Sequence, residues 1–459
     1  MKKSPAATCF EATCSPSVTK SPETAFFGRK RGSRLRRLAW RRLASSSMEK
    51  LRRMVNQIAH TQKLSSLHPL HLSLIPLLFL SSSIYKLAIS FRQNLYHFGF
   101  LRKHRLPVPV ISVGNLTWGG NGKTPMVEFI ANWLANDVGI SPLILTRGYG
   151  GADEAKMLQR HFNGTSVKIG VGANRAATAA SFLHRYGFVY PLEIPVTKSP
   201  VGSDKIGVAI FDDGMQHISM FRDLEIVMVN ALSPWGNHQL LPFGPLREPL
   251  TSFSRADAVV IHHADMVQDD SLSVIKLRIL EMNRFLPIYL SAATPSHFFK
   301  SPNVSIRLPL DAVFEKIVLC VSAIGSPSSF VQRIKKMGAL YVDSLDYSDH
   351  HQFQLKDIKM IKARLQNLKN KFGSEPTIVV TEKVYLSASS YQCSIISIKI
   401  MVLKVLIVSG LLQDYDRDNE ILRGLDPFEV FVLCCKLKIL RHDGLSEDTF
   451  KMMLARSLS

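Results

Sequence analysis

The sequence predicts an α/β protein with a mainly parallel sheet and flanking helices of the phosphate-binding-loop (P-loop) type, and two observations support this fold class. Between residues 106 and 300, apolar runs of strand length alternate with segments of helical length, which is the pattern of parallel strands joined by helices. The apolar run at residues 110–113 leads into a glycine-rich turn that ends in Gly-Lys-Thr at 122–124. An apolar-periodic segment at 126–134 follows, and this order of strand, glycines and helix is typical of a loop that binds phosphates.

Residues 1–47 form a basic segment that is rich in serine, lysine and arginine and poor in acids. Such a composition is typical of an organelle-targeting presequence, and the arginine-rich start favours the mitochondrion over the plastid. Met48 offers a second start, in which case residues 1–47 are an upstream extension. The chain carries a formal net charge of +21, but its basic residues are not interleaved with aromatic ones on one patch, so we expect no nucleic-acid partner.

Residues 48–105 are expected to form a helical segment that associates with a membrane. Their apolar stretch begins near residue 67 and is interrupted by Pro76 and Lys86, so it falls short of the roughly 20 clean apolar residues of a bilayer span. Basic residues border the stretch between 92 and 105. An apolar helix with a basic border is typical of a helix that lies on a membrane surface; the alternative is a helix packed on the catalytic domain.

The glycine-rich turn supplies the candidate nucleotide-binding residues, which are Gly119, Gly120, Asn121, Gly122, Lys123, Thr124 and Pro125. Glycines let the backbone fold tightly, so that successive N–H groups point at one anion, and the start of the helix adds positive potential. The Lys123 ammonium can reach the outer phosphates, and the Thr124 hydroxyl can bind Mg²⁺. Thr117 stands where the usual first glycine of this motif falls.

The strand predicted at residues 206–211 ends in two aspartates, Asp212 and Asp213. A carboxylate at the end of a strand beside a phosphate-binding loop is what holds Mg²⁺ in P-loop proteins. The alternative is that the two aspartates only form a turn, but the Gly-Lys-Thr upstream favours the metal site. We therefore predict that Thr124, Asp212 and Asp213 bind Mg²⁺.

The rest of the chain divides into two α/β domains, a P-loop domain at 106–300 and a smaller domain at 301–459. Further strands of the first domain are predicted at 141–146, 167–171, 224–229 and 258–261, with helices opening at 153 and 176. The second domain is predicted to contain strands at 316–321 and 377–381 and a helix that ends near 337. Its polar loop at 346–353 carries two adjacent histidines, of which we expect one at most to be functional.

Taken together, these motifs resemble one family, the tetraacyldisaccharide 4′-kinases of lipid A biosynthesis, in its plant organellar form. The resemblance covers roughly residues 67–459. It rests on the motifs Pro-Val-Pro-Val at 107–110, Val-Gly-Asn-Leu-Thr at 113–117, Gly-Gly-Asn-Gly-Lys-Thr-Pro at 119–125, Arg-Gly-Tyr-Gly at 147–150, Asp-Glu at 153–154, Asp-Asp-Gly-Met-Gln-His at 212–217, Arg-Asp at 222–223, Gly-Pro-Leu-Arg-Glu at 244–248, Asp-His at 349–350 and Thr-Glu-Lys at 381–383.

The resemblance implies an enzyme that transfers the γ-phosphate of ATP to the 4′-hydroxyl of tetraacyldisaccharide 1-phosphate, an acylated glucosamine disaccharide lipid, to give lipid IVA. It implies ATP and Mg²⁺ as cofactors, a membrane surface as partner, and a C-terminal domain that closes over the nucleotide. It also implies that Lys123 neutralises the transferred phosphate and that Asp153, partnered by His350, acts as base on the sugar hydroxyl. Arg247 and Glu248 match a loop near the active site and are candidate substrate-binding residues.

The chain departs from the family pattern at two places. Alanines flank Asp153-Glu154 where the family has glycine and proline. After Thr-Glu-Lys the family continues with aspartate, whereas this chain reads Val384, and the expected continuation starts only at Asp414. Residues 384–413 are apolar without clear periodicity, and they begin with valine and end with glutamine, as an in-frame intron with GT and CAG ends would. We therefore expect this segment to be a retained intron.

Two other classes of protein share parts of the pattern. A GTPase or a nucleotide-driven chaperone also carries Gly-Gly-x-Gly-Lys-Thr, but the Asn-Lys-x-Asp motif that binds guanine does not occur in this sequence. A membrane-surface binding protein would explain the basic and apolar N-terminal part but not Lys123, Asp212 and Asp213 together. The six cysteines show neither a Cys-x-x-Cys pair nor zinc-site spacing, so we expect reduced, structural thiols.

Overall fold

The computed structural model describes residues 51, 54–61, 68–148, 153–190, 204–301, 303, 306–349, 351, 353–386 and 428–458. The chain divides into two compact units, Met1–Gln57 and Ile58–Ser459. The first unit is described only at residues 51 and 54–57, which are helical. The predicted presequence at 1–47, the candidate base partner His350 and residues 387–413 of the predicted insert lie outside the described residues.

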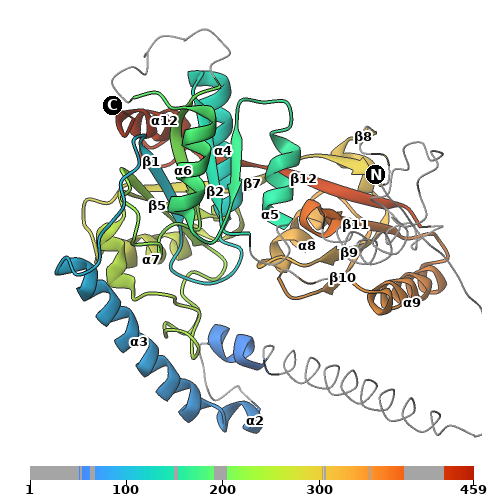
Figure 1. The fold of residues 1–459 in the computed structure, drawn as a ribbon. Helices are drawn as coiled ribbons and strands as arrows, with labels where there is room; N and C mark the ends of the chain where they lie inside the picture. The colour runs from blue at the N-terminus through green and yellow to red at the C-terminus, as the bar shows by residue number, and fades with distance from the viewer. Residues whose placement is uncertain are drawn as a thin grey trace, which may run out of the picture. The chain divides into compact units, whose positions relative to one another are not determined.

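The described residues form one sheet of twelve strands (Figure 1). In chain order the strands are β1 (Val110–Gly114), β2 (Ser141–Thr146), β3 (Lys168–Val171), β4 (Ile206–Asp212), β5 (Leu224–Asn230), β6 (Ala258–His262), β7 (Ile288–Lys300), β8 (Arg307–Leu308), β9 (Ile317–Ser322), β10 (Tyr341–Asp346), β11 (Thr377–Thr381) and β12 (Val430–Leu440). Their order across the sheet is β10-β9-β11-β12-β7-β6-β5-β1-β4-β2-β3, with β8 beside β7. Among the strands that the structure describes, only the β7–β12 and β7–β8 pairs are antiparallel, so the predicted mainly parallel α/β fold is confirmed.

Helices flank this sheet, as expected for strands joined by helical crossovers. They are α4 (Lys123–Asn132), α5 (Asp153–His161), α6 (Arg175–Tyr186), α7 (Asp269–Leu280), α8 (Pro327–Lys336), α9 (Leu355–Phe372) and α12 (Glu447–Arg456). Two further helices, α2 (Pro69–Leu72) and α3 (Ile75–His97), precede β1. A π-helical turn, Trp133–Val138, continues α4 and ends at a left-handed glycine, Gly139. The strands and helices predicted between residues 110 and 261 all form.

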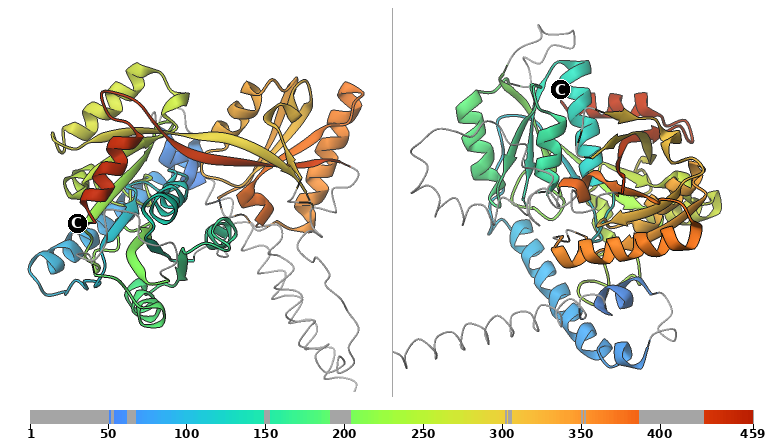
Figure 2. Two further views of the ribbon diagram at one scale, coloured as in Figure 1. Left: turned by 90° about the horizontal axis from the view of Figure 1, so that it is seen from above. Right: turned by 90° about the vertical axis from the view of Figure 1, so that its right-hand side faces the viewer.

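The two long strands β7 and β12 join the P-loop part of the sheet to the β9–β11 part. They pair antiparallel from Phe431 opposite Lys300 to Leu440 opposite Leu290, and they run side by side in the left view of Figure 2. The boundary predicted at 300/301 therefore falls at the end of β7, inside a continuous sheet. Strand β7 is buried at 289–292 but partly exposed from 293 to 297, so its apolar pattern is interrupted there.

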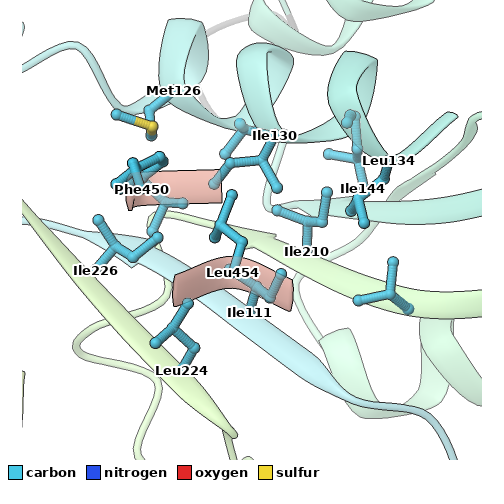
Figure 3. Close-up of a cluster of buried hydrophobic side chains, with 14 of the residues drawn as sticks. Ile111, Met126, Ile130, Leu134, Ile144, Ile210, Leu224, Ile226, Phe450 and Leu454 are labelled. Atoms are coloured by element: carbon cyan, nitrogen blue, oxygen red, sulfur yellow. The ribbon is translucent and has the colours of Figure 1, made fainter. Parts of the chain in front are cut away.

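The C-terminal helix α12 packs on the core of the P-loop part. Helix α4 buries Met126 and Ile130 against the sheet, in the helical spacing that puts apolar residues on one face. Phe450 and Leu454 of α12 join this cluster (Figure 3). The Phe450 ring lies 5.0 Å from the ring of Tyr289, in an edge-to-face arrangement, so the end of the chain helps to fix the helix that starts at Lys123.

Helix α3 presents a stripe of exposed apolar side chains. Leu77, Leu80, Ile84, Leu87 and Phe91 follow each other at helical spacing, and all are exposed. Within the described residues, α3 is the one helix long and apolar enough to cross a membrane by length and composition. The sequence predicted an interrupted stretch, but Pro76 lies in the first turn of α3, where a proline does not break a helix.

Candidate active site

The glycine-rich turn connects β1 to α4 and needs glycine at its last position. Gly122 caps α4 with a left-handed backbone, φ 79°. A Cβ atom at this position would lie 2.6 Å from Cδ2 of the buried His262 imidazole, closer than side chains can approach. Gly119 also has a positive φ, 101°, which favours glycine. Pro125 is the third residue of α4. A backbone N–H at this position would have no partner within the helix, so proline, which lacks that N–H, is tolerated.

Amide side chains hold the turn in place. The Asn121 side chain donates to the Thr117 hydroxyl over 3.0 Å, so the threonine in the place of the usual first glycine anchors the loop from within. Asn230, at the end of β5, donates to the Gly120 carbonyl over 3.1 Å. Gly120 also faces Gly325. A Cβ at residue 325 would lie 1.9 Å from the Gly120 nitrogen, so the close approach of the two backbones requires glycine at residue 325 and favours it at residue 120.

Thr124 and Asp212 meet at the ends of adjacent strands. Strand β4 pairs parallel to β1 with Asp212 opposite Val113, which brings the carboxylate beside the start of α4. The Thr124 hydroxyl donates to Asp212 Oδ2 over 3.2 Å. Asp212 is buried, and its other oxygen, Oδ1, has no hydrogen-bond partner within the described part of the chain. Burial raises the pKa of Asp212 above its ordinary value, with the charge of Glu154 adding to the rise and Lys123 opposing it.

These oxygens fit a magnesium ion. Mg²⁺ prefers carboxylate and hydroxyl oxygens, takes one or two carboxylates from the protein, and completes its coordination with water and phosphate. A buried carboxylate oxygen without a partner, beside a hydroxyl, offers that donor set. No cluster of three or more histidine, cysteine, aspartate or glutamate side chains suited to a metal occurs among the described residues.

Asp213 contacts two basic side chains. Arg247 Nη1 donates to both of its carboxylate oxygens, over 2.7 and 2.9 Å, and the Lys123 ammonium lies 3.5 Å from Oδ1. Burial would raise the pKa of Asp213, but Lys123 and Arg247 lower it below its ordinary value. Its backbone is left-handed, φ 58°, a conformation that aspartate tolerates better than most residues. In this geometry Asp213 holds Lys123 and Arg247 at the same carboxylate.

Arg175 binds the backbone of the two strand-end aspartates, a role that was not predicted from the sequence. Its guanidinium donates to the Asp213 carbonyl over 2.9 Å and also to the Asp212 carbonyl. It is buried at the start of α6, which Asn174 caps by accepting from the Ala177 N–H. The Asn-Arg pair before a helix was visible in the sequence as a helix start, but nothing in the sequence indicated that its arginine reaches the strand-end aspartates.

Helix α3 is bonded to the loop that carries Arg247 and Glu248. The Tyr85 hydroxyl donates to the Arg247 carbonyl over 3.0 Å. Gln93 donates to Glu248 Oε2 over 3.0 Å. Ser252 and Arg255 donate to the same oxygen, over 3.0 and 2.7 Å. Glu248 is thus buried and joins α3 to the active-site loop, whereas Arg247 reaches into the site.

Helix α5 begins at Asp153, and the position of that residue's side chain is not among the features the structure describes. The next residue, Glu154, lies close enough to Asp212 for its charge to raise the pKa of that carboxyl group. The charge of the first turn of α5 is therefore felt at Asp212.

Of the two adjacent histidines, the described one has a structural role. His351 Nε2 lies 2.9 Å from Oδ2 of Asp357, which is buried in the capping box of α9. Its ring stacks on Tyr347 with centroids 4.6 Å apart. Because His351 is fixed in this way, a functional histidine in this loop would be His350, which lies outside the described residues.

Comparison with known proteins finds similarity along most of the chain. The model of the family described as tetraacyldisaccharide-1-P 4′-kinase matches residues 74–409. An Arabidopsis thaliana protein named "Probable tetraacyldisaccharide 4'-kinase, mitochondrial" is 47% identical over 420 residues, a match that covers 90% of this chain and 98% of that protein. The tetraacyldisaccharide 4′-kinase of Syntrophus aciditrophicus is 31% identical over 328 residues, which covers 66% of this chain and 81% of that protein.

A solved structure is similar in fold. The crystal structure of LpxK from Aquifex aeolicus in complex with ATP superposes with a TM-score of 0.51 at 24% identity, and the match covers 84% of this chain and 99% of that chain. At this identity the likeness bears on the fold, and it agrees with the P-loop architecture described above. The kinase matches do not favour the alternative of a GTPase or a nucleotide-driven chaperone.

Proposed function

Since the chain belongs to the tetraacyldisaccharide-1-P 4′-kinase family, we propose that it transfers the γ-phosphate of ATP to the 4′-hydroxyl of tetraacyldisaccharide 1-phosphate. The hydroxyl oxygen forms a bond to the γ-phosphorus, the bond between that phosphorus and the β–γ bridging oxygen breaks, and ADP leaves. The hydroxyl proton passes to a base of the enzyme. The observation that supports this reaction best is the contact of Thr124 with the buried Asp212 directly after the glycine-rich turn.

The turn and Lys123 would bind the phosphates of ATP. The backbone N–H groups of residues 119–122 and the start of α4 favour an anion at this point. Lys123 now lies 3.5 Å from Asp213, so its ammonium would shift only from a carboxylate to a phosphate when ATP binds. Arg247, held by the same carboxylate, would add positive charge beside the transferred group. Phosphoryl transfer depends mainly on such positioning and charge neutralisation.

Thr124 and Asp212 would hold Mg²⁺, and Asp213 would support the site through its contacts with Lys123 and Arg247. When bound, the ion neutralises charge on the phosphates. Thr124 and Asp212 orient their oxygens toward one point, because α4 and β4 fix them 3.2 Å apart.

Asp153 would act as the base on the sugar hydroxyl, with His350 as its partner. This role comes from the resemblance of Asp153-Glu154 and Asp349-His350 to the family motifs. A carboxylate near the attacking hydroxyl is what the chemistry requires. A partner histidine from a different part of the sheet would complete the base only when both parts are in place, which limits wasteful hydrolysis of ATP.

We further propose that the enzyme works at a mitochondrial membrane. The exposed apolar stripe of α3 would enter the lipid surface, while its other contacts hold it to the Arg247–Glu248 loop. An acylated substrate could then reach the site with its chains still in the membrane. The mitochondrion is supported by the basic start of the chain and by the name of the Arabidopsis relative.

The test is transfer of labelled γ-phosphate from ATP to tetraacyldisaccharide 1-phosphate in detergent micelles. Wild type should label the lipid, and Lys123→Met should lower the rate by about 10²-fold or more, since it removes the charge that neutralises the phosphates. The same assay with labelled GTP in place of ATP tests the GTPase alternative. A kinase that uses ATP should transfer less label from GTP to the lipid, whereas a GTPase should hydrolyse GTP and leave the lipid unlabelled with either nucleotide. A folded wild-type protein that binds ATP and leaves the lipid unlabelled would show that the acceptor is a different molecule.

A further inference from the structure

A single ammonium joins two segments that come from opposite parts of the sheet. Lys383 follows β11, and its side chain is 16% exposed. Its Nζ atom lies 2.8 Å from Oδ1 of Asp349, in the loop after β10, and 3.4 Å from Oε1 of Glu154, in the first turn of α5. Burial would lower the pKa of Lys383, but Asp349 and Glu154 raise it above its ordinary value, so the bridge stays charged.

The neighbouring residue extends the bridge to the nucleotide-binding helix. Glu382 Oε1 lies 3.2 Å from Nε2 of His161, the last residue of α5. The other ring nitrogen, Nδ1, lies 2.9 Å from Oε1 of Glu128 in α4. Residues 382–383 therefore contact both ends of the nine-residue helix α5, and α5 is tied in turn to the helix that begins with Lys123.

The two acids that Lys383 joins have informative positions in the chain. Glu154 directly follows Asp153, and Asp349 directly precedes His350. We propose that Lys383 is a positioning residue, which holds the start of α5 and the loop after β10 at the distance that phosphoryl transfer requires. The proposal rests on the proposed function, because Asp153 and His350 carry the base in that reaction. Lys383 itself takes no proton from the substrate.

A role in stability alone would not need this placement. A buried ion pair is weak support for stability, because desolvation of the charges offsets their attraction. The contacts of Lys383 instead fix the distance between the start of α5 and the loop after β10. Such a distance matters for the rate, because displacement of a catalytic group by about 1 Å can cost roughly 10²-fold. A positioning role therefore predicts a loss in kcat that exceeds any loss in ATP affinity or in melting temperature.

The experiment compares wild type with Lys383→Met, Lys383→Arg and the control Lys451→Met. Lys451 also joins two acids, Glu447 at 2.9 Å and Asp137 at 3.5 Å, but on the surface of α12. Kinetics give kcat and KM for ATP and lipid, equilibrium titration gives the Kd for ATP, and amide hydrogen exchange reports on residues 153–161. We expect Lys383→Met to lower kcat by about 10²-fold and to speed exchange in α5, with the Kd for ATP changed less than about threefold.

Lys383→Arg should recover most of the rate, since it keeps the charge, and Lys451→Met should match wild type. The proposal is overturned if Lys383→Met keeps kcat, or if kcat, ATP affinity and exchange along the whole chain worsen together. If wild type labels no lipid, the proposed function has failed. Amide hydrogen exchange of Lys383→Met then still tests whether Lys383 positions α5. Faster exchange confined to α5 supports that role, and unchanged exchange refutes it.

Discussion

His161 gives a prediction about stability whose dependence on pH follows from the structure. Its imidazole lies between the carboxylates of Glu128 and Glu382, at 2.9 and 3.2 Å. Burial alone would lower its pKa, but the two carboxylates raise it from 6.5 to about 10. The charged form is therefore favoured in the folded chain, and His161→Gln removes that stabilisation.

The size and sign follow from linkage. A rise in pKa from 6.5 to about 10 corresponds to roughly 4–5 kcal/mol at about 1.36 kcal/mol per pKa unit. The side chain is 21% exposed, so screening by water reduces the expected contribution to roughly 2–3 kcal/mol. Because the pKa is raised on folding, this contribution is complete below about pH 6.5 and disappears as the pH rises to about 10.

The assay is urea unfolding of wild type and His161→Gln over this pH range. The difference in free energy of unfolding should be largest near pH 6.5 and should shrink steadily toward pH 10. His442→Gln is the matched control: it removes an exposed histidine that lies 3.0 Å from Asp443, and it should change stability by less than about 0.5 kcal/mol. A His161→Gln difference that stays constant or grows with pH would refute the reasoning.

Three further changes have expected outcomes. Gly122→Ala should raise the Kd for ATP at least about tenfold by titration, because the new Cβ would meet His262 at 2.6 Å and the backbone is left-handed. Phe450→Ala should lower the free energy of unfolding by about 3–5 kcal/mol in urea, because it leaves a cavity beneath α4. Deletion of residues 384–413 should increase the yield of soluble protein and keep phosphotransfer, because it restores Lys-Asp-Tyr and returns a tyrosine to the place where Tyr385 packs on Phe299 at 5.1 Å.

Each of these has its own control or contrary result. Gly373→Ala also alters a left-handed glycine, φ 70°, but has open space around it, so ATP binding should not change. A Phe450→Ala protein that melts like wild type would show that α12 does not support α4. For the deletion, sequencing of mature transcripts gives a second readout: messages that mostly retain codons 384–413, together with an inactive shortened protein, would rule out the intron.

The sequence predicted the strands and the loop of the P-loop part because these features are local. An apolar run followed by glycines and Lys-Thr determines β1, the turn and the start of α4 without help from distant residues. The same is true of β4, whose apolar run ends in Asp212. Adjacency of Thr124 and Asp212 then follows from parallel pairing of β1 and β4. The alternation of strands and helices implied a parallel sheet but not which strands are neighbours.

Other features depend on residues far apart in the chain and could not be predicted from local pattern. The β7–β12 pairing joins segments about 140 residues apart, and β7 is only partly buried, so it carries no clear period. Arg175 and Lys383 act through contacts 34 to 229 residues away, and a basic residue after a strand or before a helix is usually a solvated one. The sequence therefore indicated on which elements Arg175 and Lys383 lie but not which distant groups they contact.

The most direct test of the account is to locate the phosphate on the product. The purified enzyme would be incubated with ATP and tetraacyldisaccharide 1-phosphate, and the product would be examined by phosphorus and proton NMR. The account predicts one new phosphate, on the 4′-oxygen, and none with Lys123→Met. A phosphate on another oxygen, or an unchanged lipid beside ATP bound to folded enzyme, would contradict it.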